Sequence, residues 1–319
     1  MQGYHMSIFQ DIKKSFRIEA AFDNWVNYRN TLTDYLIGLA DGENVPLYFP
    51  KDILKELQLP TLAIVGAGEC NDIDLKRILP YFSKIALIDM DEEAMKGALC
   101  KYGLYNCDTI IVKSISLTGV SDASYEIFAD ALIDYLQEVK EVITPKSFED
   151  FAVKRLREQY ENLKKPDVSK DMGKYDYVWC FGLHSQIQSL YGYIYHCFLM
   201  NLKHSLFQGQ VLQDERFMDC LRDMNTLMIP EINDLLLSMS KRMCVIGSEW
   251  DTLSDPKDDY YVDTQPANPI EGAYQGIMDI RNRDYNINES MIMWPFDKER
   301  NIYYEMLIQT IDKNVDNCV

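Results

Sequence analysis

Hydrophobic and polar positions alternate along the middle of the chain in a way that predicts strands separated by helices. Three short apolar runs end near turn residues, at 61–65, 85–88 and 109–112. Runs of this length are typical of strands buried on both faces of a parallel sheet. Asn71-Asp72 can cap a helix through Leu79, and Glu92 to Tyr102 should form the helix after the second run. Strands and helices that alternate with short links predict a parallel sheet with right-handed crossovers.

The second half of the chain continues this pattern and then changes it. Further strands are expected at 175–180 and 243–247, and further helices at 187–206 and 216–240. The chain then has apolar stretches at 291–294 and 302–311, separated by the segment Pro295-Phe296-Asp297-Lys298. A link this short joins antiparallel strands. We therefore expect a mostly parallel seven-stranded sheet with an antiparallel C-terminal hairpin.

Two helical regions are expected beside this sheet. Apolar positions at helical spacing predict a helical annex over residues 1–57, and the remaining residues 58–319 should form the main domain. About sixty residues separate the third and fourth strands, and they carry helical patterns at 128–142 and 148–163. A crossover between parallel strands needs about a dozen residues. We interpret residues 120–172 as a helical insertion over the carboxyl edge of the sheet.

Composition limits the partners and the compartment of this protein. The 319 residues carry 50 acidic and 32 basic side chains, a formal net charge of -18, which argues against a nucleic-acid partner. The 8 cysteines include no Cys-x-x-Cys pair, so buried free thiols in a reducing compartment fit better than disulfides or zinc. The first residues do not resemble a signal peptide, and no apolar stretch approaches the ~20 residues of a membrane helix. We expect a cytoplasmic protein without a membrane partner.

A glycine turn and a strand-end acid form the strongest candidate site. Gly66 and Gly68 follow the first strand, and Asp89 ends the second. Ligands of open parallel sheets bind at this edge, where glycine allows close backbone approach and a carboxylate can accept ribose hydroxyls. A purely structural turn remains the alternative. The third glycine of a dinucleotide fingerprint is replaced by Asn71, which argues against a bound pyrophosphate.

With these residues, the sequence over roughly 61–311 resembles the class I S-adenosylmethionine-dependent methyltransferases. The segment 65–72 resembles the family's first motif, 87–91 its ribose-binding acid and the residue that flanks adenine, and 176–181 its fourth strand. The resemblance implies a Rossmann-like three-layer α/β sandwich, S-adenosylmethionine as cofactor, and an unidentified small-molecule methyl acceptor. The cofactor-binding residues that it implies are Gly66, Ala67, Gly68, Asn71, Asp72, Asp89, Met90, Ser116, Cys180 and Phe181.

The first motif departs from the family pattern. Ile64 stands where the family often has an acid, and Cys70 stands at its usual third glycine. Asn71 or Asp72 would then substitute in the contacts to the methionine end of the cofactor. After the third strand, where the family has an acid near adenine, the sequence offers the hydroxyl of Ser116 instead.

His184 is the best candidate for a base or for positioning the acceptor, because it follows the fourth strand at the predicted reaction edge. The alternative is a structural residue at a helix start. Glu249 and Trp250 follow the fifth strand and are candidates to line the acceptor pocket, or else simply pack a loop. No metal-ligand spacing is present.

Three aromatic and basic residues near the N-terminus fit either a lid over the cofactor or the core. Trp25, Tyr28 and Arg29 could cover the cofactor, where aromatic faces favour a sulfonium, but their spacing also fits core contacts. The segment 249–289 is strongly acidic, and we expect it to be a solvated loop. Its negative charge would attract a cationic or amine acceptor.

Two other functions remain open at this stage. The same turn and Asp89 could serve an NAD-dependent oxidoreductase. The chain could also be a non-catalytic binding protein whose helical insertion docks a partner. The sequence does not indicate an oligomeric state.

Overall fold

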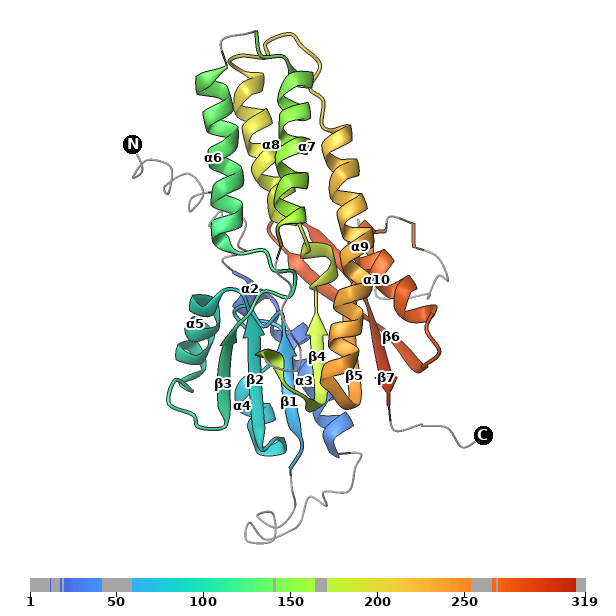
Figure 1. Cartoon of the computed structure of the whole chain (residues 1–319). Coiled ribbons are helices and arrows are strands. Elements are labelled where there is room, and N and C mark those ends of the chain that lie inside the picture. Colours follow the sequence, from blue (N-terminus) through green and yellow to red (C-terminus); the bar gives the residue numbers. More distant parts are fainter. Residues whose placement is uncertain are drawn as a thin grey trace.

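The computed structural model describes residues 12, 18, 20–41, 59–139, 142–163, 171–253, 266–267 and 269–313. Its centre is a seven-stranded sheet in the order β3-β2-β1-β4-β5-β7-β6 (Figure 1). The strands are β1 (Thr61–Val65), β2 (Lys84–Asp89), β3 (Ile110–Ser114), β4 (Tyr175–Phe181), β5 (Ser240–Leu253), β6 (Asn286–Asp297) and β7 (Ile302–Asp312). The first five strands are parallel, and β7 runs antiparallel to β5 and β6. The predicted fold class is confirmed.

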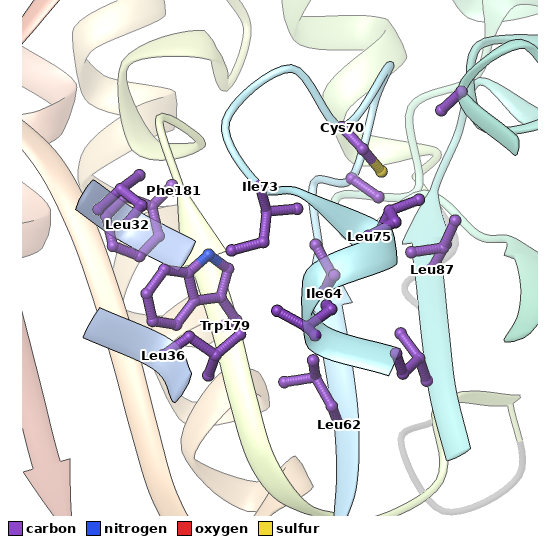
Figure 2. Packing of buried hydrophobic residues seen from close by; sticks show 14 of the residues in the cluster. Leu32, Leu36, Leu62, Ile64, Cys70, Ile73, Leu75, Leu87, Trp179 and Phe181 are labelled. Carbon is purple, nitrogen blue, oxygen red and sulfur yellow. The ribbon is translucent and has the colours of Figure 1, made fainter. Parts of the chain in front are cut away.

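Helices cover both faces of this sheet and make three layers. One face packs against α2 (Ala21–Asn24), α3 (Val26–Asp41), α4 (Leu75–Ile78), the short 3-10 helix η1 (Leu79–Tyr81) and α5 (Glu92–Tyr102). In Figure 2, Leu32 and Leu36 of α3 face Trp179 of β4, and all three are fully buried. The opposite face packs against the C-terminal half of α9 (Glu215–Met239) and against α10 (Glu271–Arg281).

A helical bundle rises beyond the carboxyl ends of the parallel strands (Figure 1). It consists of α6 (Asp122–Glu138), α7 (Pro145–Glu161), α8 (Ser189–Lys203) and the first half of α9, around a hydrophobic core of its own. Capping boxes at Ser121 and Thr144 begin α6 and α7. The two helices expected within 120–172 therefore share their core with two later helices. Because α9 continues from this core onto the sheet, it connects the helical bundle to the sheet.

Two sequence expectations differ from the structure. The side chain of Asp74, and not Asn71-Asp72, caps α4, which is shorter than expected. Helix α10 lies within the 249–289 stretch that was expected to be a loop. Its many charged neighbours obscured a buried stripe formed by Ala273, Ile277 and Ile280. Helices α2 and α3 form the described part of the predicted annex, and the rest of residues 1–57 is largely outside the described residues.

No described helix has the length and apolar composition needed to cross a membrane.

Candidate active site

The turn after β1 is held against β2 by its own backbone. The N–H groups of Gly66 and Ala67 both donate to the carbonyl oxygen of Ile88, at 2.9 and 3.2 Å. Gly66 and Gly68 have φ angles of +70° and +45°, which glycine adopts without steric cost. A Cβ on Gly66 would lie 3.4 Å from the side chain of Leu183, whereas one on Gly68 would meet nothing within 4 Å. The turn therefore leaves its backbone open to a ligand.

Cys70 replaces the third glycine of this turn and keeps a glycine-like conformation. Its φ is +49°, a region that disfavours an L-residue by roughly 1–2 kcal/mol. Its N–H donates to the Ala67 carbonyl at 2.8 Å, and the Tyr102 hydroxyl donates to the carbonyls of Cys70 and Ile73. The thiol side chain is buried in the core under the turn (Figure 2). Burial and these hydrogen bonds offset the backbone strain.

Asp89 is fixed by two backbone donors. Its Oδ2 accepts from the Gly68 N–H and its Oδ1 accepts from the Asp91 N–H, both at 2.9 Å. Burial raises the pKa of this carboxyl above its usual range, and the hydrogen bonds oppose that shift. Asp91 in turn caps α5 by accepting from the Ala94 N–H at 3.0 Å. Each Asp89 oxygen keeps a lone pair for a further donor.

Two adjoining clefts, of about 360 and 270 Å³, open at this edge of the sheet and share Gly66, Asp89, Asp91, Leu183 and Gln186. Of the residues that the sequence predicts, the first cleft contains Gly66, Ala67, Gly68, Asn71, Asp72, Asp89 and Phe181. The second contains Gly66, Asp89, Met90 and Ser116. Asp89 therefore lies where the two clefts meet.

The first cleft has an aromatic wall formed by segments from opposite ends of the chain. Trp25 and Tyr28 come from the N-terminal helices, and Trp294 and Phe296 come from β6. The Trp25 Nε1–H donates to the Phe296 carbonyl at 3.0 Å, and the Trp25 and Trp294 ring centroids are 4.9 Å apart. Trp25 and Tyr28 belong to the core and also line the first cleft, so the core contacts expected for them are present in the structure.

Arg29 anchors the N-terminal helices on the glycine turn. Its Nη1 donates to the carbonyls of Phe22 and Asn71 at 2.8 and 3.1 Å, and its guanidinium lies over the Phe22 ring. The side chain is buried and does not line either cleft. Its contacts correspond to the core alternative and not to a lid.

Asp72 is a carboxyl of the first cleft with a raised pKa. Burial raises its pKa to about 6, while its own backbone hydrogen bond and the nearby charge of Arg29 partly oppose this shift. The charge of Asp72 also raises the pKa of the buried Tyr28 hydroxyl, after the larger effect of burial. Asp72 therefore changes charge close to neutral pH.

His184, the candidate base, is not in the cleft. It begins the 3-10 helix η3 (His184–Gln186) and is completely buried. Its Nε2 lies 2.8 Å from Asn233 Oδ1, and its Nδ1 lies 3.2 Å from Ser248 Oγ. A Cβ on Gly276 of α10 would lie 2.7 Å from the imidazole, so α10 makes room for this ring. Burial lowers the pKa of His184, and we assign the residue a structural role.

Cys180 also departs from its expected position. It is fully buried among residues on the face of the sheet covered by α9 and lines neither cleft, whereas the adjacent Phe181 lines the first cleft. Side chains alternate across a strand, so only one of the two can face the cleft. Burial holds the pKa of the Cys180 thiol well above its usual range.

Glu249 and Trp250 separate in the same way. Trp250 packs against Ile277 and Leu307, with the Arg281 guanidinium 4.8 Å from its ring centroid. Glu249 lies on the other face, where its Oε1 accepts from the Ser185 Oγ–H at 2.7 Å. Of the two candidates for an acceptor pocket, only Glu249 is close to the first cleft.

No group of three or more His, Cys, Asp or Glu side chains is placed to hold a metal ion among the described residues.

No family model and no curated protein matches the sequence. The similarities found are to solved structures. The magnesium protoporphyrin IX methyltransferase ChlM from Synechocystis PCC 6803, solved with bound S-adenosylmethionine, is 11% identical over 93% of this chain and 86% of that chain, with a TM-score of 0.38. The N-methyltransferase NodS from Bradyrhizobium japonicum WM9, solved with S-adenosyl-L-homocysteine, is 10% identical over 95% and 97%, with a TM-score of 0.41.

The strand order decides the fold. Strand β7 lies antiparallel between β5 and β6, and the parallel strands follow the order β3-β2-β1-β4-β5. The expected mostly parallel seven-stranded sheet with an antiparallel C-terminal hairpin is present. The chain has the class I methyltransferase fold.

Within this methyltransferase fold, several residues at the clefts were not identified from the sequence. Leu183 and Gln186 line both clefts, because the segment after β4 passes between them. Asp122, at the first turn of α6, lines the second cleft. An acid after the third strand is thus present, but later in the chain than the family pattern places it. The capping signal at Ser121 could have located it.

Proposed function

We propose that this protein binds S-adenosylmethionine across the two clefts and transfers its methyl group to a small-molecule acceptor. The observation that carries the proposal is the Asp89 carboxylate, held by the Gly68 N–H at the junction of the clefts. A rigid carboxylate at the end of the second strand can accept both hydroxyls of a ribose. The two clefts would then take the two ends of the cofactor.

The residues around the clefts fit this ligand. Met90, Ser116 and Asp122 line the second cleft and would surround the adenine with an apolar contact and polar groups. Asn71 and Asp72 line the first cleft and would bind the methionine end, where the Asp72 carboxylate matches an ammonium group. The substitution of Ile64 and Cys70 in the first motif is thus balanced by acids and amides slightly further along the chain.

The main task of the protein in this reaction is to position the cofactor and the acceptor. S-adenosylmethionine, when bound, supplies a methyl group carried by a positively charged sulfur. Asp89 and the glycine turn hold the ligand in one orientation, and orientation alone can contribute a large part of a rate enhancement. Trp25, Tyr28 and Trp294 line the first cleft, and the faces of aromatic rings attract positive charge.

The geometry disfavours an NAD-dependent oxidoreductase. A pyrophosphate binds at the free N–H groups of the helix that follows the glycine turn. Here that helix is only four residues long, and the Asp74 carboxylate already accepts from the N–H groups of Lys76 and Arg77. The negative charge of Asp74 at this point would repel a pyrophosphate, a group that NAD has and S-adenosylmethionine lacks.

Calorimetric titration of the purified protein with S-adenosylmethionine, S-adenosylhomocysteine and NAD tests this proposal. We expect both sulfur compounds to bind and NAD not to. Binding of NAD alone would replace the proposal with the oxidoreductase, and binding of none would favour a non-catalytic protein.

A further inference from the structure

The carboxyl of Glu249 is buried beside the first cleft with only one of its two oxygens satisfied. Oε1 accepts from the Ser185 Oγ–H at 2.7 Å, whereas Oε2 has no hydrogen-bond partner among the described residues. The residue is 2% exposed. A buried polar atom without a partner disfavours the folded state, so the unsatisfied carboxyl oxygen indicates a ligand group that could donate to it.

Glu249 lies directly behind the wall of the cleft. Gly182 and Trp294 both line the first cleft, and a Cβ on Gly182 would lie 3.5 Å from Trp294 Cη2 and 3.8 Å from Glu249 Oε1. The space between these three residues would therefore hold about one methyl group at ordinary contact distances. Gly182, which has no side chain, is therefore a cleft residue adjacent to Glu249 Oε1.

The surroundings of Glu249 favour a positively charged partner. No ion pair joins it to a Lys, Arg or His among the described side chains, and burial raises its pKa. The charge of Glu249 contributes to raised pKa values of Tyr28 and Tyr304, where burial is the larger cause. The Tyr28 and Trp294 rings are stacked with centroids 5.7 Å apart, and Trp294 and Tyr304 are 5.8 Å apart. Carboxyl oxygens beside aromatic rings are a setting in which cations are stabilised.

We propose that the methyl acceptor is an amine and that Glu249 Oε2 accepts a hydrogen bond from its nitrogen. This inference rests on the proposed function. An acidic acceptor, such as a carboxylate or a phenolate, would bring negative charge next to both Glu249 and Asp72, and like charges repel. An amine would instead donate an N–H to Glu249 Oε2 and so give this oxygen a hydrogen-bond partner.

The same arrangement suits the charge that transfer to an amine creates. An amine bound as an ammonium first gives one proton to the Glu249 carboxylate or to water, which frees the nitrogen lone pair. This lone pair forms the new C–N bond, the electron pair of the broken C–S bond stays on sulfur, and the nitrogen takes over the positive charge. Its proton then leaves to the Glu249 carboxylate or to water. A cation next to Glu249 lowers the pKa of that carboxyl and so favours its ionised form, which can accept a proton.

A binding experiment tests this without knowledge of the natural acceptor. Protein saturated with S-adenosylhomocysteine is titrated with trimethylammonium and with tert-butanol, an uncharged molecule of similar shape, and tryptophan fluorescence reports contact with Trp25 and Trp294. We expect the cation to bind at least about tenfold more tightly than the alcohol. Glu249→Gln should abolish this preference, and Glu299→Gln, at an exposed residue of the β6–β7 turn, should keep it.

Equal binding of the two probes, or binding of neither, would overturn the amine proposal, as would a preference that Glu249→Gln leaves intact. If Glu249→Gln does not fold, Glu249→Asp replaces it, because the shorter side chain keeps the charge but draws the carboxyl back, and it should reduce the preference. S-adenosylhomocysteine affinity is measured first on every variant. Its absence in the wild-type protein would contradict the proposed function, and its presence without cation preference would contradict only the choice of acceptor.

Discussion

The Gly68 N–H donates to Asp89 Oδ2 at 2.9 Å, so the glycine turn and the strand-end acid are one hydrogen-bonded unit. The bond also explains why the carboxyl points to the junction of the two clefts. Because both residues line the first cleft, one ligand can contact the turn and the acid together. A change at either residue should affect both contacts.

Replacing Asp89 tests this unit directly. Asp89→Ala removes the acceptor for the ribose hydroxyls and frees the Gly68 N–H, and hydrogen bonds to a charged group contribute about 1.5–3 kcal/mol each. We expect S-adenosylhomocysteine affinity, measured by calorimetry, to fall by more than about tenfold. Asp108→Ala, at an exposed position before β3, is the matched control. Equal affinity of the two variants would refute the ribose assignment.

The conformation of the glycine turn predicts opposite effects for two glycine substitutions. Gly66→Ala places a Cβ at a φ of +70° and 3.4 Å from Leu183, so it should lower the free energy of unfolding by roughly 1–2 kcal/mol. Gly97→Ala, in the exposed middle of α5 with nothing within 4 Å, should raise it by about 0.5–1 kcal/mol. Urea denaturation measures both. A Gly66→Ala protein as stable as wild type would show that an alanine fits this position of the turn without strain.

His184 should matter for stability and not for cofactor binding. His184→Ala leaves Asn233 and Ser248 without their partner inside the core, and each buried group left unsatisfied lowers the free energy of unfolding by about 1–3 kcal/mol. Denaturation should report this loss, while S-adenosylhomocysteine affinity of the folded variant stays within about twofold of wild type. A stable variant that loses methyl transfer would restore His184 as the base.

Ionisation of Asp72 should make cofactor affinity depend on pH. Its pKa is about 6 in the fold, so the carboxyl is neutral well below that value and charged above it. If Asp72 binds the ammonium group of the cofactor, affinity should rise as the pH increases through about 6. Asp72→Asn should flatten the profile between pH 5 and pH 7, as calorimetry at several pH values would record. A wild-type profile without this rise would remove Asp72 from the cofactor site.

The same ionisation affects stability with the opposite sign. The folded-state pKa of Asp72 is raised above the unfolded value of 3.8, so the folded protein binds the extra proton between these two values. Without ligand, the contribution of Asp72 to stability should thus decrease as the pH rises from about 4 through about 6. Ligand binding and unliganded stability should change in opposite directions over this range.

The sheet and its glycine turn could be predicted from the sequence because they depend on local patterns. The runs that form β1 and β2 are apolar and bounded by turn residues, and the bounds of α5 follow from its Asp91 cap and from Gly103 after its end. The position of Asp89 at the edge of the sheet follows from the end of its strand. Parallel topology then brings Gly68 and Asp89 together.

The composition of the site beyond this unit depends on contacts between distant segments. Nothing local indicates that Trp25 meets Trp294, or that α10 provides a glycine where the His184 ring needs space. The direction of a side chain after a strand depends on such packing, which is why His184 was expected in the cleft and lies in the core. Glu249 and Trp250, by contrast, lie on opposite faces because neighbouring side chains of a strand alternate.

A crystal structure of the complex with S-adenosylhomocysteine tests the central claim most directly. We predict that both ribose hydroxyls lie within hydrogen-bond distance of Asp89, with adenine beside Met90 and Asp122 and the sulfur in the first cleft. A ligand bound elsewhere, or one whose ribose does not contact Asp89, would contradict the assignment.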